Sequence, residues 1–136
     1  MVKSVSHIRV RFSETDAMGV VYHSNYLNWF EVARVDLMDS IGMPYKKFAE
    51  NKIHLPVVDA HLEYKRPAKF DDKLEVVAYI GEAPTVKIKV QYEVLRDGVL
   101  LCKGHTTHVF IGEKGTPVKP PKEFLERLRE LVKEEL

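Results

Sequence analysis

The chain has 136 residues, of which 45% are hydrophobic and 30% charged. This length and composition predict a single folded domain over residues 1–136 and exclude a disordered chain. The 21 basic and 20 acidic residues leave a formal net charge of +1, too little for a nucleic-acid or anionic membrane partner. Apolar runs fall far short of the roughly 18 residues of a membrane helix, so no membrane insertion is expected.

Cysteine usage and the start of the chain indicate a compartment. Cys102 is the only cysteine, so no disulfide can form within the chain. The first residues do not follow the basic, apolar, small-residue order of a secretory signal. We therefore expect a cytoplasmic protein, in which Cys102 is an inert buried thiol rather than a nucleophile.

The first half of the chain predicts one strand and one long helix. Apolar and polar residues alternate over residues 8–12, which is typical of a strand with one buried face, ending near Ser13. A helix is expected over residues 26–41, capped by Ser24 or Asn25 and ended by Gly42. Its apolar residues leave only a narrow polar stripe, so this helix must be covered on most sides. We interpret the aromatic residues Tyr22, Tyr26, Trp29 and Phe30 as core, although Tyr22 is near enough to Asp16 in the chain to line a binding pocket.

The second half predicts four strands, at residues 57–65, 73–82, 85–96 and 99–111. Apolar residues alternate most clearly along the third of them, and Asp97-Gly98 is a typical hairpin turn into the fourth. We interpret the four strands as successive hairpins of an antiparallel sheet. From Pro120 onward, apolar residues at helical spacing among charged ones predict a C-terminal amphipathic surface helix.

This order of elements belongs to the α+β class. A strand, a long apolar helix and four antiparallel strands place the sheet around the helix, an architecture called the hotdog fold. One sheet covers one side of a helix and leaves its own edges open. We therefore expect two subunits to join their sheets or to pack helix against helix.

The segment of residues 12–26 links the first strand to the long helix and carries the candidate chemistry. Asp16 lies in this segment, and His23 stands where the helix begins. A helix start offers unpaired N–H groups and a partial positive charge, which suit a developing oxyanion. The residues alone leave a structural alternative open, in which Asp16 forms an Asx turn and Ser24 or Asn25 caps the helix.

This segment resembles the signature of the hydroxybenzoyl-CoA thioesterase family, and most closely its branch of Tol-Pal cluster acyl-CoA thioesterases. The matching residues are Thr15, Asp16, Ala17, Gly19, Val20, Val21, Tyr22, His23 and Tyr26, followed by Tyr64, Pro67, Asp71 and Asp72. The likeness covers residues 7–111. Glu14 stands where the family frequently has Asp, and Met18 where it often has a small residue.

The resemblance implies hydrolysis of an acyl-CoA thioester without a cofactor. Asp16 would be the catalytic carboxylate, acting as a general base or as a nucleophile. The backbone N–H of His23 would polarise the thioester oxygen. The residues implied at the substrate are Tyr22, Gly19, Tyr26, Lys65 and Arg66. The oligomeric state common in the family also implies a homotetramer built as a dimer of dimers.

Positively charged residues are candidates for binding the phosphates of coenzyme A. Lys65, Arg66 and Lys69 stand at a strand end, and Lys87 and Lys89 lie on the polar face of a strand. These residues fit either coenzyme A or an acyl-carrier protein as the carrier of the acyl group.

Two other functions stay open as well. A hydratase or dehydratase of acyl thioesters would leave the thioester intact, whereas a binding module for acyl-CoA or an acyl-carrier protein would use Asp16 and His23 only for structure. Release of free thiol distinguishes both from a thioesterase. No metal site is expected, because His105 and His108 are three residues apart and therefore point to opposite faces of a strand.

Overall fold

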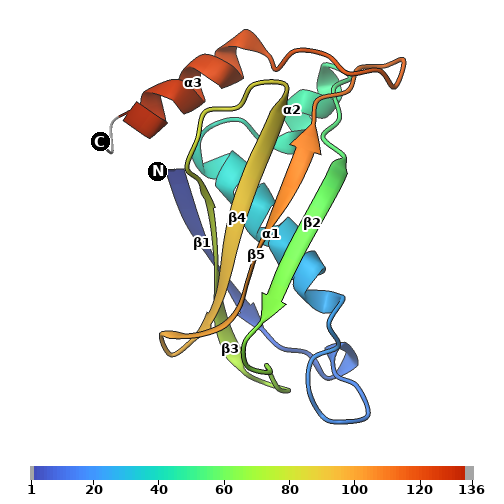
Figure 1. Cartoon of the computed structure of the whole chain (residues 1–136), viewed down its shortest axis with the longest axis vertical. Coiled ribbons are helices and arrows are strands. Elements are labelled where there is room, and N and C mark those ends of the chain that lie inside the picture. The colour runs from blue at the N-terminus through green and yellow to red at the C-terminus, as the bar shows by residue number, and fades with distance from the viewer. Residues whose placement is uncertain (1, 134–136) are drawn as a thin grey trace.

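The computed structural model describes residues 2–133, which form a curved sheet with a long helix against it. The strands are β1 (Val2–Arg9), β2 (Val57–Tyr64), β3 (Lys73–Ile80), β4 (Lys87–Arg96) and β5 (Val99–Val109). The helices are the short 3-10 helix η1 (Phe12–Glu14), α1 (Asn25–Ser40), α2 (Tyr45–Glu50) and α3 (Lys122–Lys133). Figure 1 shows the sheet curling around α1, and the predicted α+β class is confirmed.

The sheet is antiparallel, with the strand order β1-β3-β4-β5-β2. β3, β4 and β5 follow one another as hairpins, as predicted. Asp97 and Gly98 have φ values of 50° and 79°, and two left-handed residues in this position match the twist of the flanking strands. β2 pairs with β5 and not with β3, so the prediction that all four strands form successive hairpins is wrong.

The segment between β2 and β3 explains this placement. The backbone N–H groups of Lys65 and Arg66 donate to Leu101 O at 2.8 and 3.0 Å, which ties the end of β2 to β5. The chain then crosses the end of the sheet to β1, where Val10 N–H donates to Asp72 O at 2.9 Å. Such a crossing looks like a hairpin loop in the sequence, because alternation within a strand does not say which strand lies beside it.

The first strand ends earlier than predicted. β1 stops short of Ser13, and residues 12–14 form η1 instead. Glu14 N–H donates to Arg11 O at 3.0 Å, and this bond turns the chain away from the sheet. The turn leaves the Phe12 side chain 76% exposed and buries Glu14. The prediction that Phe12 lies on the buried face of the first strand is therefore wrong.

α1 begins and ends one residue before the predicted helix. Ser24 is the N-cap residue, as one of the two predicted alternatives had it, but its side chain makes no capping bond. The side-chain amide of Asn25, the other alternative, donates to Glu14 O at 2.9 Å. The buried face of α1 packs on the sheet, where Phe30 stacks on Tyr92 of β4 with ring centroids 4.2 Å apart. The opposite face of the helix exposes apolar side chains: Leu27, Val32 and Val35.

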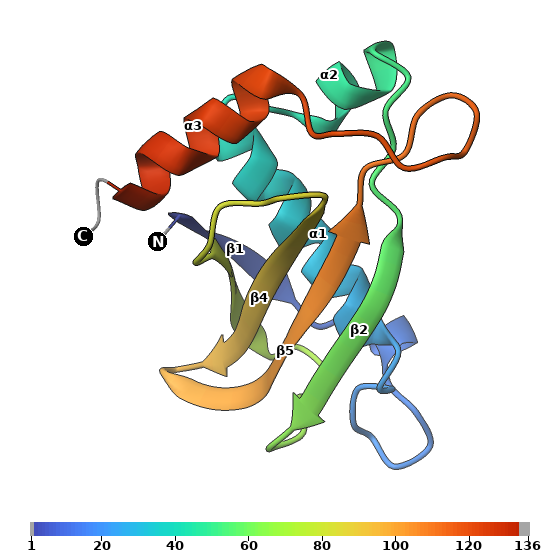
Figure 2. The ribbon, with the colours of Figure 1, turned by 45° about the horizontal axis from the view of Figure 1, so that its top comes forward.

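α2 and α3 lie at the end of the sheet where α1 finishes (Figure 2). α3 confirms the predicted C-terminal helix. α2 was not predicted, because its six residues bury only Phe48 and show no helical period. The rings of Phe48, Phe110 and Phe124 pack together in this region, Phe48 and Phe124 at a centroid distance of 5.2 Å. Within residues 2–133, no helix has the length and apolarity that crossing a membrane requires.

Candidate active site

Residues 15–21 form a tight hairpin between η1 and α1, called the 15–21 hairpin below. Thr15 and Val21 face each other as an antiparallel bridge. Asp16 N–H donates to Val20 O at 2.9 Å, and Gly19 N–H donates to Asp16 O at 3.0 Å. Gly19 has a φ of 78°, a left-handed conformation that favours glycine and lets the chain reverse here. The hairpin thus fixes the backbone of Asp16 in one place.

The carboxylate of Asp16 takes part in this turn. Its Oδ1 accepts the N–H of Met18 at 2.8 Å, so the Asx turn of the structural alternative is present. Within residues 2–133, Oδ2 has no hydrogen-bond partner. One oxygen therefore orients the carboxylate while the other remains able to accept a proton or to attack a carbonyl carbon. The structural and the chemical interpretation of Asp16 are compatible.

The 15–21 hairpin borders a cavity of about 320 Å³, called the hairpin cavity below. Its lining comprises Asp16, Met18, Val20, Val21, His23, Tyr26, Tyr64, Lys65, Arg66 and Pro67. Most of the predicted site residues are in this set. Gly19 and Tyr22 lie beside it in the chain but not in the lining. The Tyr22 ring packs against the His23 ring at a centroid distance of 4.3 Å and is exposed to solvent, so the interpretation of Tyr22 as core is wrong.

The far wall of the hairpin cavity comes from the end of β2. Val21 N–H donates to Ala68 O at 2.8 Å, and Val20 forms a bridge with Lys69, which holds the hairpin against this segment. Tyr64 and Pro67 line the cavity but were not predicted as site residues. Both belong to the Tyr-x-x-Pro part of the family signature, and that signal could have found them.

The start of α1 leaves backbone N–H groups without partners inside the helix. Tyr22 O accepts the N–H of Asn25 at 3.0 Å. In a trans peptide the C=O and N–H point in opposite directions, so the N–H of His23 points away from the helix. Within residues 2–133, neither His23 N–H nor Ser24 N–H has an acceptor. Tyr64 steadies this turn, because its hydroxyl donates to His23 O at 3.1 Å.

Tyr26 forms the floor of the hairpin cavity. Its side chain is only 2% exposed, and burial raises the pKa of its hydroxyl. The hydroxyl accepts the N–H of Ala68 at 3.3 Å. The ring makes edge-to-face contacts with Trp29 and Tyr64, with centroids 4.8 and 5.2 Å away. Tyr26 therefore supplies a rigid aromatic surface rather than a titrating group.

The candidate phosphate ligands divide into two groups. Lys65 and Arg66 line the hairpin cavity, at the end of β2. Lys69, Lys87 and Lys89 are exposed and are not in its lining. The structure thus brings Lys65 and Arg66 into the lining of the hairpin cavity, whereas Lys69 lies beside the hairpin, where it forms a bridge with Val20, and Lys87 and Lys89 lie on β4.

Comparisons with known proteins identify the family. The family model of the thioesterase-like superfamily matches residues 10–128. The chain belongs to this superfamily. Among its relatives, the acyl-CoA thioesterase YbgC of Haemophilus influenzae is 32% identical over 119 residues, which are 85% of this chain and 87% of that protein. A putative esterase of Aquifex aeolicus is 37% identical over 122 residues, 90% of this chain and 94% of that protein.

Solved structures agree with this membership. The DHNA-CoA thioesterase of Staphylococcus aureus superposes with a TM-score of 0.91 at 30% identity, covering 100% of this chain and 97% of that one. The predicted hotdog fold, the family resemblance and the class of thioester hydrolase are confirmed at the level of the family.

The other chemically notable residues of this thioesterase-like chain lie away from the hairpin cavity. Burial raises the pKa of the Cys102 thiol to about 12, which makes it a poor nucleophile. His108 is fully buried, whereas His105 is partly exposed on the other face of β5 and stacks on His61. Within residues 2–133 no three potential ligands converge on one point that could hold a metal ion.

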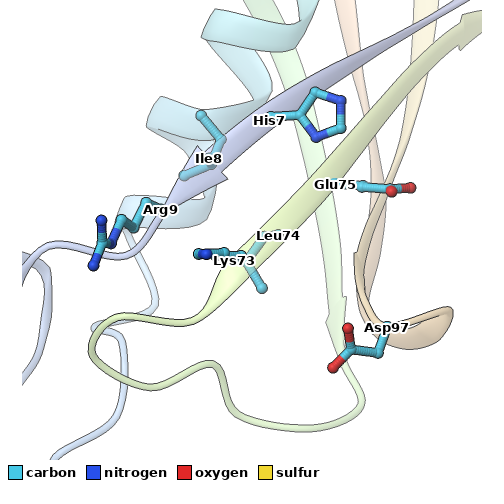
Figure 3. A pocket seen from close by; sticks show the side chains of 7 residues that line it. All are labelled: His7, Ile8, Arg9, Lys73, Leu74, Glu75 and Asp97. Atoms are coloured by element: carbon cyan, nitrogen blue, oxygen red, sulfur yellow. The ribbon is translucent and has the colours of Figure 1, made fainter.

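A second hollow, of about 410 Å³, lies on the paired strands β1 and β3 of this thioesterase-like chain (Figure 3). Its lining is His7, Ile8, Arg9, Lys73, Leu74, Glu75 and Asp97. None of the residues that match the family signature is in it, and Arg9 is paired with Asp71 outside it at 2.5 Å. The hairpin cavity is therefore the candidate active site.

Proposed function

We propose that this protein hydrolyses acyl-CoA thioesters, with Asp16 as the catalytic carboxylate and the backbone N–H of His23 as the oxyanion donor. One observation carries the proposal: a carboxylate, a helix start and two cations line the same cavity. A thioesterase needs these three groups for attack, for the developing negative charge and for the phosphates of coenzyme A. Relatives named acyl-CoA thioesterases support the same reaction.

Asp16 can promote attack in two ways. As a general base, it takes a proton from water while the oxygen of that water adds to the thioester carbonyl. As a nucleophile, it adds to the carbonyl itself and forms a mixed anhydride that water then hydrolyses. In both routes the thiolate of coenzyme A leaves, and it needs little help from an acid because a thiolate is a stable leaving group. The partnerless Oδ2 of Asp16 suits either step.

The N–H of His23 is oriented before substrate arrives. The bond from Asn25 N–H to Tyr22 O and the bond from Tyr64 to His23 O hold the peptide in place. A donor that needs no reorganisation is worth on the order of 100-fold to 1000-fold in rate when it faces a developing oxyanion. The same N–H would add little to the rate of a reaction in which the substrate's carbonyl stays planar.

Substrate is proposed to enter along the end of β2. Lys65 and Arg66 would bind the phosphates of coenzyme A, or the single phosphate of the phosphopantetheine arm of an acyl-carrier protein. The apolar walls made by Val20, Val21 and Tyr26 would meet the acyl group. Tyr22 and Gly19 are also proposed to contact the substrate. Gly19 has no side chain, so its backbone would be accessible to the substrate. We place this reaction in the cytoplasm and assign it to residues 1–136 as one domain.

We also propose the predicted homotetramer, a dimer of dimers. Two surfaces support it. β2 is a sheet edge with no buried residue, and its Val57 and Val58 are 48% and 51% exposed. The outer face of α1, with Val32 and Val35, is a second apolar surface. Sedimentation velocity at micromolar concentration should give a species of four chains, and a uniform species of 15.7 kDa would contradict it.

A thiol-release assay tests the reaction. Purified protein is given a panel of acyl-CoA esters, from short to long and aliphatic to aromatic, together with the matching acyl-carrier proteins. We expect free thiol from at least one substrate. Comparing the acyl-CoA esters with the matching acyl-carrier proteins identifies the carrier. Conversion of the acyl chain without free thiol would favour a hydratase, and saturable binding without any turnover would favour a binding module. Either result would overturn the proposal.

A further inference from the structure

Glu14 carries a carboxylate in the interior of the protein. The residue is only 4% exposed, although it ends the short helix η1 two positions before Asp16. Its Oε1 accepts the N–H of Arg11 at 2.7 Å, and its Oε2 accepts the indole N–H of Trp29 at 2.9 Å. The Arg11 side chain, 76% exposed, adds an ion pair of 3.5 Å. A buried carboxylate is costly unless it is bonded, and both oxygens of Glu14 are bonded.

The main chain of Glu14 makes two further bonds. Glu14 O accepts the N–H of Tyr22 at 2.9 Å and the side-chain amide of Asn25 at 2.9 Å. Tyr22 immediately follows the 15–21 hairpin, and Asn25 is the first residue of α1. Glu14 therefore holds together the entry of the hairpin, its exit and the first turn of the helix, while its side chain reaches one turn further to Trp29.

These contacts join the two halves of the candidate site. Asp16 is on the hairpin and the N–H of His23 is at the helix start, so their separation depends on how the hairpin sits on α1. A displacement of about 1 Å at a reacting group can cost about 100-fold in rate. Resting on the proposed function, we propose that Glu14 is a positioning residue, whose carboxylate keeps Asp16 at working distance from the oxyanion donor.

Two substitutions test this through the bond between Glu14 and Trp29. In Glu14→Gln the amide has one acceptor oxygen for two N–H donors, so one bond is lost. Trp29→Phe removes the donor and leaves the carboxylate in place. We expect each variant to lose at least tenfold in kcat, with KM changed by less than about threefold. The double variant should be no slower than the slower single variant. Without the indole N–H, the Gln oxygen can keep the bond to Arg11 while its amide nitrogen faces the phenyl ring that replaces the indole.

A matched control separates positioning from stability. Val90→Ala removes buried volume from β4, away from the hairpin cavity, and should lower the melting temperature by at least as much as Glu14→Gln. We expect its kcat to stay within twofold of the wild type. If Glu14→Gln also keeps kcat within twofold, or slows no more than Val90→Ala, Glu14 only stabilises the fold and the proposal is overturned.

Two further readouts do not depend on turnover. Trp29 is the only tryptophan, so its emission reports the loss of the Glu14 bond directly. Amide hydrogen exchange at Asp16 and Tyr22 should be at least tenfold faster in Glu14→Gln and unchanged in Val90→Ala. Unchanged exchange would overturn the proposal even if kcat fell. A wild type that hydrolyses nothing in the thioester panel would instead refute the proposed function, while the exchange rates still decide whether Glu14 holds the hairpin.

Discussion

Two polar regions of this protein are built from similar side chains and have opposite characters. At the hairpin cavity, one oxygen of Asp16 and the N–H of His23 have no hydrogen-bond partner among residues 2–133, and both lie near solvent. The second region is a closed network inside the fold, made by Arg34, Tyr45, Tyr92, Thr106 and His108. Both contain charged or titratable groups. They differ in whether those groups are already paired.

The closed network is a continuous chain of hydrogen bonds. Arg34 donates to Tyr45 at 3.0 Å and to Tyr92 at 3.0 Å. The Tyr92 hydroxyl lies 2.7 Å from that of Thr106, which lies 2.8 Å from Nε2 of His108. Nδ1 of His108 is 3.0 Å from Leu55 O, which can only accept. Nδ1 must therefore carry the proton. Nε2 then accepts from Thr106, the Thr106 oxygen accepts from Tyr92, and the Tyr92 oxygen accepts from Arg34.

This comparison shows where chemistry can occur. A network whose groups bond to one another stabilises the fold and offers little to a ligand. A site with a partnerless acceptor and a partnerless donor is less stable by itself but can bind and activate a substrate. The hairpin cavity gains that ability because Glu14, Tyr64 and the 15–21 hairpin hold its backbone, so the reactive groups need not hold it themselves.

The largest expected effect is on the open site. Asp16→Asn should lower kcat by at least about 100-fold with little change in KM or in the free energy of unfolding. Asn still accepts the N–H of Met18 and so keeps the turn, while the charge is lost. Thiol release measures the effect, and Asp39→Asn on the exposed surface of α1 is the matched control. Near-normal turnover of Asp16→Asn would make Asp16 structural.

The closed network should make stability depend on pH. Burial lowers the pKa of His108 from its ordinary 6.5 to about 4. Between these values the unfolded chain binds the proton and the folded chain does not, so the free energy of unfolding falls as the pH drops from about 6.5 to 4. The total loss from this group is about 3 kcal/mol. Denaturant titrations at several pH values measure it.

Carboxylates titrate in the lower part of the same range, so a variant isolates the histidine. His108→Gln should lack the part of the pH dependence that lies between pH 6.5 and 5. An identical slope in both proteins would show that His108 is protonated in the folded state or accessible to solvent.

A smaller effect is expected from opening the closed network at its centre. Thr106→Val keeps the volume but leaves the Tyr92 hydroxyl without an acceptor and Nε2 of His108 without a donor. We expect a loss of about 2 kcal/mol in the free energy of unfolding and an unchanged kcat at temperatures well below melting. Thr107→Val, on the other face of β5, should change stability by less than about 0.5 kcal/mol. Equal effects of the two would mean that the network contributes nothing.

The smallest effect should come from the imidazole of His23. His23→Ala removes the ring but keeps the backbone N–H that is proposed to bind the oxyanion. We expect kcat to fall by less than about tenfold in the thiol-release assay. A loss as large as that of Asp16→Asn would assign the ring a direct part in catalysis and make the site more than a carboxylate and a helix start.

The sequence by itself determined the parts of this protein that depend on local pattern. Alternation along β3, β4 and β5, the Asp97-Gly98 turn and the apolar periods of α1 and α3 are properties of neighbouring residues. The signature around Asp16 and His23 likewise lies within one short segment, so the candidate carboxylate and helix start could be predicted together. Short elements with few buried residues, such as η1 and α2, leave no period to recognise.

Only the tertiary structure decided which segments meet. It put β2 beside β5, brought Tyr64 and Arg66 to the 15–21 hairpin, and paired Glu14 with Trp29. These contacts join residues far apart in the chain, and no local period carries information about such pairs. Whether a polar group has a hydrogen-bond partner depends on these tertiary contacts. The same contacts therefore decide whether a group of polar residues forms a closed network or a reactive site.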